Sequence, residues 1–413
     1  MSLAQDLQQR GFVHQFSGES LEAILDGEKR VFYLGVDPTA TSLTIGNLAS
    51  YMLARHLVDA GHTPILLVGG GTGMIGDPGG KSSERTLLDQ AVLEENIISI
   101  TAQVEKILGI DGVRVVNNAD WLSQLNLIEF LRDVGKHFTV NSMIKKEIVK
   151  TRLDAESPMS YTEFTYSLLQ AYDFAHLFRG YGCTLQIAGS DQWTNILAGI
   201  EYIRKTENKE VYGLTNPIIV NPKTGKKFGK SEEGALWLDS EQTSPYALYQ
   251  YLRNIDDESV EQLLNIYTLR TIDGISALVA ESQGSAGSRI AQKALARDVV
   301  SFVHGVPHAD AAERVSDVLF SGDLGTLTPV ERDMLISSAP HYKAQEGEQL
   351  IDVLVGSGLA SSKREARQFL IEGAVSVSGK HVKEDAVIGV ADFDGGLALM
   401  RRGKRNVCIL MLG

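Results

Sequence analysis

Three polar residues in the middle of the chain are spaced so that they share one side of a helix. Tyr166, Gln170 and Asp173 are four and three residues apart, within a segment of helical apolar periodicity. Their phenol, amide and carboxylate groups then project together and could bind an ammonium group and a hydroxyl of a small ligand. A partly exposed polar helix face has the same pattern, so both interpretations stay open for this cluster alone.

A second polar segment follows a predicted strand. Residues 33–48 read YLGVDPTATSLTIGNL, in which a strand ends, a polar turn with Asp37 and Thr39 follows, and a helix begins near Thr44. A helix N-terminus beyond the carboxyl end of a strand is a ready site for phosphate. Gly46 would let a purine or ribose lie flat on the helix start. The segment therefore predicts nucleotide binding.

A loop rich in lysine and glycine could hold a polyphosphate. Lys227 and Lys230 flank a flexible glycine and precede Ser231 in the run KFGKS. Two lysines three residues apart on such a loop suit a mobile clamp on a chain of phosphates, although the signal is weak when taken alone.

A glycine-rich loop at 69–80 resembles two nucleotide-binding motifs without matching either. The run GTGMIG at 71–76 has dinucleotide-fingerprint spacing, but Asp77, a proline and two glycines follow where the helix should continue. Ile75 stands where the first glycine of a P-loop is required. The loop can still turn backbone amides toward an anion, with Lys81 and Arg85 beside it. A surface turn with two exposed cations fits equally well.

Strand and helix patterns alternate in the first half of the chain. The predicted strands are 31–36, 64–68, 113–116 and 184–187, and the predicted helices are 48–60, 161–178 and 191–205. This alternation is typical of a parallel sheet wrapped by helices. A mostly helical section at 122–157 interrupts it. The pattern is helical over 243–320, and from about 350 short apolar runs indicate a small α+β module.

Composition limits the class of protein. The formal net charge is −13, no apolar run reaches bilayer length, and the two cysteines lie far apart, so we expect a protein of the reducing cytoplasm. Contact with nucleic acid would be confined to local basic clusters, such as 145–152, 204–205, 363–367 and 401–405. For any one cluster alone, a solvated face is the better interpretation.

Taken together and in this order, these segments resemble a bacterial tyrosyl-tRNA synthetase, a class I aminoacyl-tRNA synthetase. KFGKS at 227–231 resembles the KMSKS loop of the family, and GSDQW at 189–193, FTYSLLQAYDF at 164–174 and LRDVGKH at 131–137 also match. The resemblance runs from residue 11 to the C-terminus, whose module resembles S4-type RNA-binding domains. It implies an α/β fold with a Rossmann-like parallel-sheet catalytic domain, followed by an all-helical domain and a small α+β S4-like domain.

The expected domain boundaries follow from the patterns and the resemblance together. We expect a catalytic domain at 1–220, with a helical dimerisation insertion at about 122–157. The KMSKS loop and a helical anticodon-recognition domain would occupy 221–325, a linker 326–348 and the RNA-binding domain 349–413.

The resemblance implies that tyrosine attacks the α-phosphate of ATP, that pyrophosphate leaves, and that the adenylate then loads the terminal ribose of tRNA(Tyr). The residues implied to bind tyrosine are Tyr33 and Asp173 at its phenol oxygen, Asp77, Tyr166 and Gln170 at its ammonium group, and Gln192 near its carboxylate. Those implied to bind ATP are Asp37, Gly46, Gly189, Asp191, Lys230 and Ser231. The implied catalytic residues are Thr39, Lys81, Arg85, Lys227 and Lys230 at the leaving pyrophosphate, together with Thr44 and Asn47.

The resemblance also implies the partners. Lys363, Arg364 and Arg367 would contact tRNA, and the protein would form a homodimer through residues near Phe130 to Met143. No protein ligand to a metal is implied, because Mg²⁺ would arrive with ATP.

The chain departs from the family at its first helix. The family signature His-Ile-Gly-His is here Thr44-Ile-Gly-Asn47, without either histidine. Asn47 can still donate a hydrogen bond toward phosphate, whereas Thr44 has a shorter reach and is also well suited to cap the helix. Our hypothesis is that activation proceeds with weakened or rearranged transition-state contacts. Ala188 and Thr194 also replace family glycines.

Two other functions remain compatible with these residues. One is a paralogue that makes tyrosyl-adenylate for an acceptor other than tRNA, which the retained C-terminal module disfavours. The other is an RNA-binding protein that senses tyrosine without turnover, which the retained cationic residues disfavour. A tryptophan-specific relative is disfavoured by Tyr33 and Asp173, which suit a phenol.

Overall fold

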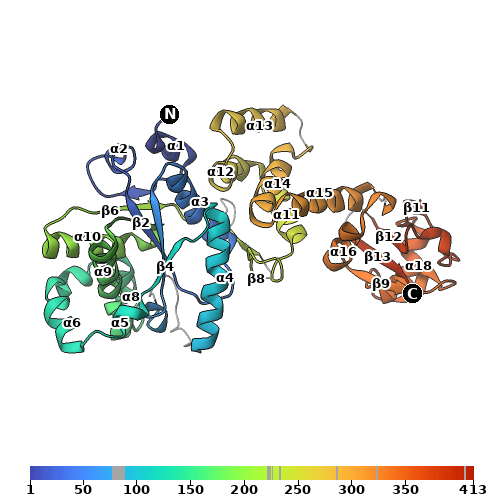
Figure 1. Cartoon of the computed structure of the whole chain (residues 1–413). Helices are drawn as coiled ribbons and strands as arrows, with labels where there is room; N and C mark the ends of the chain where they lie inside the picture. The colour runs from blue at the N-terminus through green and yellow to red at the C-terminus, as the bar shows by residue number, and fades with distance from the viewer. Residues whose placement is uncertain are drawn as a thin grey trace. The chain divides into compact units, whose positions relative to one another are not determined.

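The computed structural model describes residues 1–76, 89–220, 225, 227–231, 234–284, 287–321, 324–403 and 406–413 (Figure 1). The chain forms two compact units: Met1–Gln242 with Asp256–Ala291, and Thr243–Ile255 with Gln292–Gly413. None of the described helices is long and apolar enough to cross a membrane.

The first unit is built on a six-stranded sheet with the order β1-β6-β5-β2-β3-β4. Its strands are β1 (Gln15–Phe16), β2 (Val31–Val36), β3 (Thr63–Val68), β4 (Arg114–Asn117), β5 (Cys183–Gly189) and β6 (Tyr212–Asn216). Only β1 runs antiparallel to its neighbour in this sheet. The predicted parallel sheet is therefore confirmed, with β1 and β6 added at an edge that the sequence patterns did not reveal.

The helices of the first unit pack on this sheet or on other helices around it (Figure 1). They are α1 (Leu3–Arg10), α2 (Leu21–Leu25), α3 (Ile45–Asp59), α4 (Gln90–Leu108), α5 (Ala119–Leu122), α6 (Leu127–Asp133), α7 (Val140–Met143), α8 (Glu147–Asp154), α9 (Tyr161–Tyr181), α10 (Trp193–Glu207), α12 (Asp257–Tyr267) and α13 (Ile272–Gly284). Two very short strands, β7 (Lys230–Ser231) and β8 (Gly234–Ala235), pair with each other. Helices α6 to α8 make the section at 122–157 mostly helical, as predicted.

Local sequence signals explain why α9 begins and ends where it does. Ser160 caps its first turn and forms a reciprocal capping box with Glu163. Gly182, with φ of 65°, adopts the left-handed conformation that ends the helix. Phe174 packs inside, with its ring centroid 5.3 Å from that of Tyr33 on β2. The helix is thereby fixed in register against the middle of the sheet.

The second unit combines helices with a five-stranded sheet of order β11-β10-β12-β13-β9. Its helices are α11 (Pro245–Arg253), most of α14 (Ile290–His304), α15 (Val306–Ser321), α16 (Pro329–Ser338), α17 (Leu350–Gly356) and α18 (Lys363–Ile371). Its strands are β9 (His341–Ala344), β10 (Val375–Val377), β11 (Lys380–His381), β12 (Leu397–Arg402) and β13 (Asn406–Leu412). The predicted α+β module and the helical run before it are both present.

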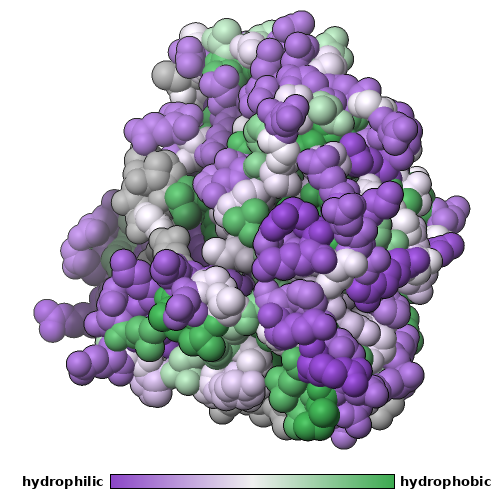
Figure 2. Space-filling view, turned by 90° about the vertical axis from the view of Figure 1, so that its left-hand side faces the viewer, coloured by the Kyte–Doolittle hydropathy of each residue, from purple (hydrophilic) through white to green (hydrophobic). Residues whose placement is uncertain are grey.

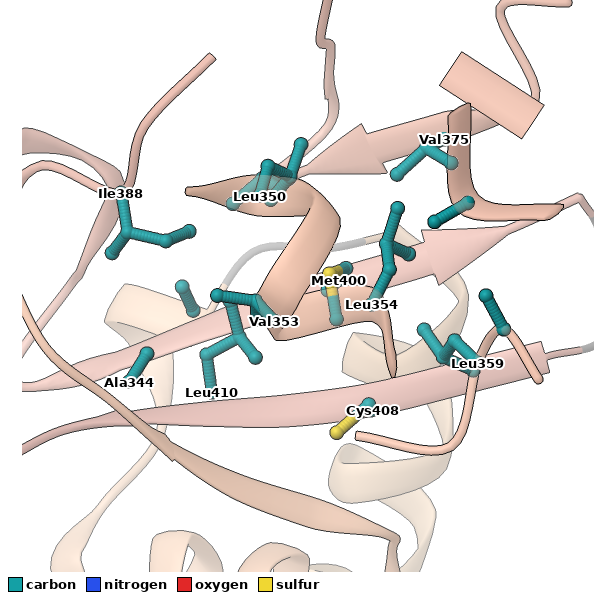
Figure 3. Packing of buried hydrophobic residues seen from close by; sticks show 14 of the residues in the cluster. Ala344, Leu350, Val353, Leu354, Leu359, Val375, Ile388, Met400, Cys408 and Leu410 are labelled. Atoms are coloured by element: carbon teal, nitrogen blue, oxygen red, sulfur yellow. The ribbon is translucent and has the colours of Figure 1, made fainter. Parts of the chain in front are cut away.

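The core of that module is closely packed. Leu350, Val353 and Leu354 of α17 lie against Met400 and Leu410 of the sheet, and all five are at most 1% exposed (Figure 3). The segment 326–348, expected as a linker, contains α16 and β9. Strand β9 pairs with β13 in parallel, so this part of the segment belongs to the sheet.

Candidate active site

A cavity of ≈ 530 Å³ opens at the carboxyl ends of β2 and β5 in the first unit. The chain runs outward from β2 through β3 to β4 and then returns to β5 on the other side of β2. Ligands of open parallel sheets bind where the strand order reverses in this way. The predicted residues that line the cavity are Tyr33, Asp37, Thr39, Thr44, Gly46, Asn47, Tyr166, Gln170, Asp173, Gly189, Asp191, Gln192 and Lys227.

The other predicted residues cannot be placed in the same way. Asp77, Lys81 and Arg85 lie outside the described residues. For Lys230 and Ser231 the structure describes the backbone, which forms β7, and not the side chains.

A buried carboxylate lies in the wall of the cavity. Asp173 on α9 is 1% exposed and accepts two hydrogen bonds, from Trp121 Nε1 at 2.7 Å and from Asn118 Nδ2 at 2.9 Å. Burial raises the pKa of the Asp173 carboxyl to about 7, the two donors oppose this, and the charge of Asp37 adds to it. The carboxyl group therefore changes its charge near neutral pH.

Tyr33 supplies a buried hydroxyl to the same cavity. Its side chain is 1% exposed, and Oη has no hydrogen-bond partner among the described residues. Burial, and then the negative charge of Asp173, raises the pKa of the Tyr33 phenol well above its usual value. The hydroxyl is thus neutral and available to a ligand. A buried polar group without a partner is costly, and a ligand oxygen at this position would relieve that cost.

Asn118 and Trp121 were not among the residues singled out from the sequence. Asn118 follows directly after β4, and Trp121 lies one turn later on α5, where its indole stacks on His176 with ring centroids 4.1 Å apart. Asn118 also accepts from Gly71 N at 2.7 Å and donates to Thr72 Oγ1 at 2.9 Å. One amide thus connects the glycine-rich loop to Asp173.

The glycine-rich loop has no room for side chains at two positions. A Cβ atom on Gly69 would lie 2.3 Å from Asp37 Oδ1, and one on Gly70 would lie 2.3 Å from Asn117 Oδ1. Glycine is needed here because the loop backbone packs directly against polar side chains at the ends of β2 and β4. The described part of the loop thereby helps to position the cavity wall.

The start of α3 forms another part of the lining. Thr44 is the N-cap residue, and its side chain and that of Asn47 form a reciprocal capping box. The interpretation of Thr44 as a helix cap is therefore confirmed. Ile45 N also donates to Leu236 O at 2.9 Å, which joins the helix start to the segment after β8.

The KFGKS segment lies against this helix start. Leu236 N donates to Gly229 O at 2.9 Å, and a Cβ on Gly229 would lie 2.5 Å from Ile45 Cγ2. Lys227 Nζ lies 3.7 Å from Asp191 Oδ2, and its side chain is 56% exposed. A cationic group therefore lies at the cavity edge, in an ion pair weak enough to exchange for a ligand phosphate.

The predicted RNA-binding residues lie on α18 in the second unit. Lys363 is 2.5 Å from Asp352, and Arg367 is 3.7 Å from Glu384. Both cations are more than half exposed, so each pair is a surface interaction that contributes little and can rearrange. Arg364 is exposed on the same helix.

Comparison with known proteins agrees with this arrangement. The family model of class I tRNA synthetases (W and Y) matches residues 26–321, and the model of the tyrosine–tRNA ligase SYY-like C-terminal domain matches residues 331–410. The tyrosine–tRNA ligase of Staphylococcus haemolyticus is 45% identical over 413 residues, covering 98% of each chain. That of Geobacillus stearothermophilus is 43% identical over 419 residues, covering 99% of each.

A solved structure is similar as well. A C-terminally truncated mitochondrial tyrosyl-tRNA synthetase of Aspergillus nidulans has a TM-score of 0.69 and 30% identity, over 77% of this chain and 94% of that one. The chain therefore belongs to the class I tRNA synthetases. Within that class its full-length relatives named here are tyrosine–tRNA ligases, and its C-terminal region matches their characteristic domain.

Proposed function

We propose that the cavity of the first unit binds L-tyrosine beside ATP, so that the chain acts as a tyrosine–tRNA ligase through the residues described above. The carboxylate of tyrosine attacks the α-phosphate of ATP, forming tyrosyl-adenylate and releasing diphosphate. The adenylate then transfers tyrosine to the 3′ end of tRNA(Tyr) and releases AMP. The observation that carries this assignment is the buried pair of Tyr33 Oη and the Asp173 carboxylate, which line one cavity.

These two groups would recognise the phenol of tyrosine. Asp173 keeps acceptor capacity after bonding Trp121 and Asn118, and Tyr33 Oη has no described partner. Phenylalanine would leave both groups buried and unsatisfied. Each buried group without a partner costs about 1–3 kcal/mol of binding free energy. The two groups together therefore account for a preference for tyrosine over phenylalanine of about 30-fold to more than 10⁴-fold.

The other tyrosine-binding roles follow from position in the cavity. Tyr166 and Gln170 lie on α9, on the same side as Asp173, and would hold the ammonium group. We assign Asp77 to the same role by resemblance alone. Gln192 follows β5 and would lie near the substrate carboxylate. Its Oε1 accepts from Asn195 Nδ2 at 3.1 Å, which holds the side chain beside the start of α10.

ATP would lie across the ends of β2 and β5. Gly46 at the start of α3 and Gly189 at the end of β5 both line the cavity without a side chain, which permits close approach of the nucleoside. Asp37 and Asp191, which line the cavity, would contact it, and we assign Ser231 and Lys230 to ATP by resemblance. Binding and positioning, rather than covalent catalysis by the protein, would supply most of the rate enhancement.

Cationic groups would stabilise the departing diphosphate. Lys227 lies at the cavity edge and Thr39 lines it, and we assign Lys81, Arg85 and Lys230 to the same role by resemblance. Mg²⁺ would enter bound to ATP, because this ion retains waters and binds chiefly through substrate phosphates. We place the reaction in the cytoplasm, where ATP and tRNA meet.

The second unit would bind tRNA. Its α18 presents Lys363, Arg364 and Arg367 from an otherwise acidic chain, whose formal net charge is −13. A confined basic helix of this kind provides a local electrostatic footprint for a phosphate backbone. We propose that the RNA-binding domain is the module of 349–413 together with β9, which the linker prediction had left outside it, and that 221–325 holds the KMSKS loop and anticodon recognition.

The test is tyrosine-dependent exchange of labelled pyrophosphate into ATP, followed by transfer of tyrosine to total tRNA. A tyrosine–tRNA ligase shows both activities. Exchange without transfer would instead support an adenylate-forming enzyme with another acceptor. Tyrosine binding without exchange would support a sensing protein. Either result would overturn the proposal.

We further propose that the protein is a homodimer. The section at 122–157 exposes large apolar side chains, with Leu127 68%, Ile128 69% and Val140 62% exposed. Figure 2, which views the side of the first unit carrying α6, shows hydrophobic patches on the lower part of that face. Apolar surface gathered in this way marks protein–protein contacts.

The dimer is tested by sedimentation equilibrium at low micromolar concentration. We expect a dimer for the wild type and a monomer for Ile128→Glu. The matched control is Val330→Glu on α16, which changes an equally exposed apolar residue, 67% exposed, and should remain dimeric. A stable and active wild-type monomer would refute the proposal.

A further inference from the structure

The indole that donates to Asp173 lies on a very short helix. Trp121 belongs to α5, which spans only Ala119–Leu122, and the side chain of Asn118 does not cap this helix. A helix of one turn has few hydrogen bonds of its own to hold it. The direction of the Trp121 Nε1–H bond, which meets Asp173 Oδ1 at 2.7 Å, therefore depends on what packs around the indole.

The ring of His176 covers one face of this indole. The two ring centroids are 4.1 Å apart and the ring planes are inclined by 14°, so the rings are stacked. His176 follows Asp173 by three residues on α9, which places both side chains on one side of that helix. The same helix thus supplies the acceptor of the hydrogen bond and the surface against which its donor lies.

The stack on Trp121 is what distinguishes the His176 side chain. The residue is only partly buried, whereas its neighbours Ala175 and Leu177 are fully buried in the core. Among the described residues, none forms a hydrogen bond or an ion pair with its imidazole, and Trp121 is its one aromatic contact. Burial, and then the charge of Arg179, lowers the pKa of His176, so the ring is mostly neutral at pH 7.

We propose that His176 is a positioning residue for tyrosine recognition, whose ring holds the Trp121 indole so that Nε1–H stays directed at the Asp173 carboxylate. This inference rests on the proposed tyrosine–tRNA ligase activity, in which Asp173 recognises the phenol of tyrosine. His176 is not among the residues that line the cavity, so it would not touch the substrate. Its effect on tyrosine binding passes through Trp121 and then Asp173.

The pH at which tyrosine binds reports on this chain of contacts, because it follows the charge of Asp173. Among the described residues, the titratable groups coupled to this carboxyl are Asp37 and Tyr33, and Trp121 is an uncharged donor to it. The charge that acts on His176 is that of Arg179 on the same helix. Weaker donation by the indole raises the pKa of the carboxyl and shifts tyrosine binding to higher pH.

Replacement of His176 by alanine should have a moderate effect. A stacked aromatic pair shifts an equilibrium about two- to twelvefold, which limits how far loss of the stack can weaken the indole hydrogen bond. The midpoint of tyrosine binding should therefore rise by about 0.4 to 1.1 pH units. At pH 7.5, with a wild-type pKa of about 7 for Asp173, affinity for tyrosine should fall about 1.4- to fourfold.

The experiment is calorimetric titration of L-tyrosine from pH 6 to 9 for His176→Ala, His176→Phe, Trp121→Phe and the double variant His176→Ala with Trp121→Phe. His176→Phe retains a flat ring on the indole and should keep the wild-type midpoint. In Trp121→Phe no N–H remains to be directed, so the addition of His176→Ala should not move the midpoint further. A residue that only stabilised the fold would lower the melting temperature and leave the midpoint in place.

His56→Ala is the matched control. His56 is another partly buried histidine of the first unit that contacts an aromatic ring, with its centroid 5.3 Å from that of Phe12, and it does not line the cavity. The substitution removes the same imidazole at a place without a connection to Asp173. It should lower thermal stability as His176→Ala does and leave the midpoint of tyrosine binding unchanged.

The outcomes are distinct. An active wild type in which His176→Ala keeps the wild-type midpoint, or raises it equally with and without the indole N–H, overturns the inference while the ligase assignment stands. A midpoint for His176→Phe as high as that of His176→Ala overturns it as well. A wild type without tyrosine-dependent pyrophosphate exchange overturns the ligase assignment itself.

Discussion

Replacing Trp121 by phenylalanine should change the pH at which the protein binds tyrosine. The indole N–H donates to Asp173 Oδ1 at 2.7 Å, and it is one of two hydrogen bonds that hold down the pKa of this buried carboxyl, which is about 7. Phenylalanine removes the donor while keeping an aromatic ring beside His176. The Asp173 carboxyl must be ionised to accept a strong hydrogen bond from the phenol. Loss of the indole donor raises the pKa of this carboxyl, and the smaller ionised fraction should weaken tyrosine binding.

The magnitude follows from the strength of the lost bond. A hydrogen bond to a charged group contributes about 1.5–3 kcal/mol, which makes protonation of the carboxyl about 10- to 150-fold more favourable. With a wild-type pKa of about 7, roughly three quarters of the carboxyl groups are ionised at pH 7.5. The ionised fraction in the variant falls to between about a quarter and a few per cent, so affinity for tyrosine should fall about three- to fortyfold.

The assay is calorimetric titration of L-tyrosine between pH 6 and 9. We expect wild-type affinity to rise through a midpoint near 7 and the midpoint of Trp121→Phe to lie about one to two pH units higher, so that the loss of affinity is much smaller at pH 9 than at pH 7.5. Trp193→Phe is the matched control, because Trp193 does not line the cavity and makes no bond to Asp173. An unchanged midpoint with a loss of affinity that is equal at every pH would refute the reasoning.

Three further perturbations test other parts of the account. Tyr33→Phe removes the unpartnered hydroxyl and should reduce selectivity for tyrosine over phenylalanine in pyrophosphate exchange by about five- to 150-fold; equal selectivity would exclude Tyr33 from phenol recognition. Gly70→Ala would drive a methyl group against Asn117, and should lower the free energy of unfolding measured in urea by about 1–3 kcal/mol and weaken tyrosine binding. A variant as stable as the wild type would show that the loop relaxes freely. Leu354→Ala, at a fully buried position of the second unit, should lower the free energy of unfolding of that unit by about 2–5 kcal/mol. As temperature rises, tRNA charging should then be lost before pyrophosphate exchange; loss of both activities at the same temperature would contradict separate roles for the units.

Much of the first unit was predictable because its periodicities are strong. The run at 31–36 matches β2 residue for residue, and α9 begins at Tyr161, as predicted, behind a serine cap. Three polar residues of α9 were grouped from their spacing alone, and helical geometry does place them in one cavity. Local rules suffice wherever the partners lie within a few residues of one another.

Other features depend on contacts between distant segments. The donors to Asp173 come from Asn118 and Trp121, which precede it by 55 and 52 residues, and only the closed sheet brings them together. A signal was present, because Asn118 directly follows a strand whose carboxyl end shares an edge with that of β2. Strand β9 is four residues long and is stabilised by its pairing with β13. Its own sequence is therefore too short to predict a strand.

The orientation of the Thr44 side chain illustrates the same limit. Its type predicted a cap, and the cap is present, but the sequence could not show that its hydroxyl also fixes the amide of Asn47. That bond depends on the rotamers of both side chains.

The central claim is that one pocket recognises the phenol of tyrosine through Tyr33 and Asp173, and a crystal structure with bound L-tyrosine tests it most directly. We predict that the phenol oxygen lies about 2.6–3.2 Å from both Tyr33 Oη and a carboxylate oxygen of Asp173. A bound tyrosine whose phenol lies away from these two groups would contradict the account.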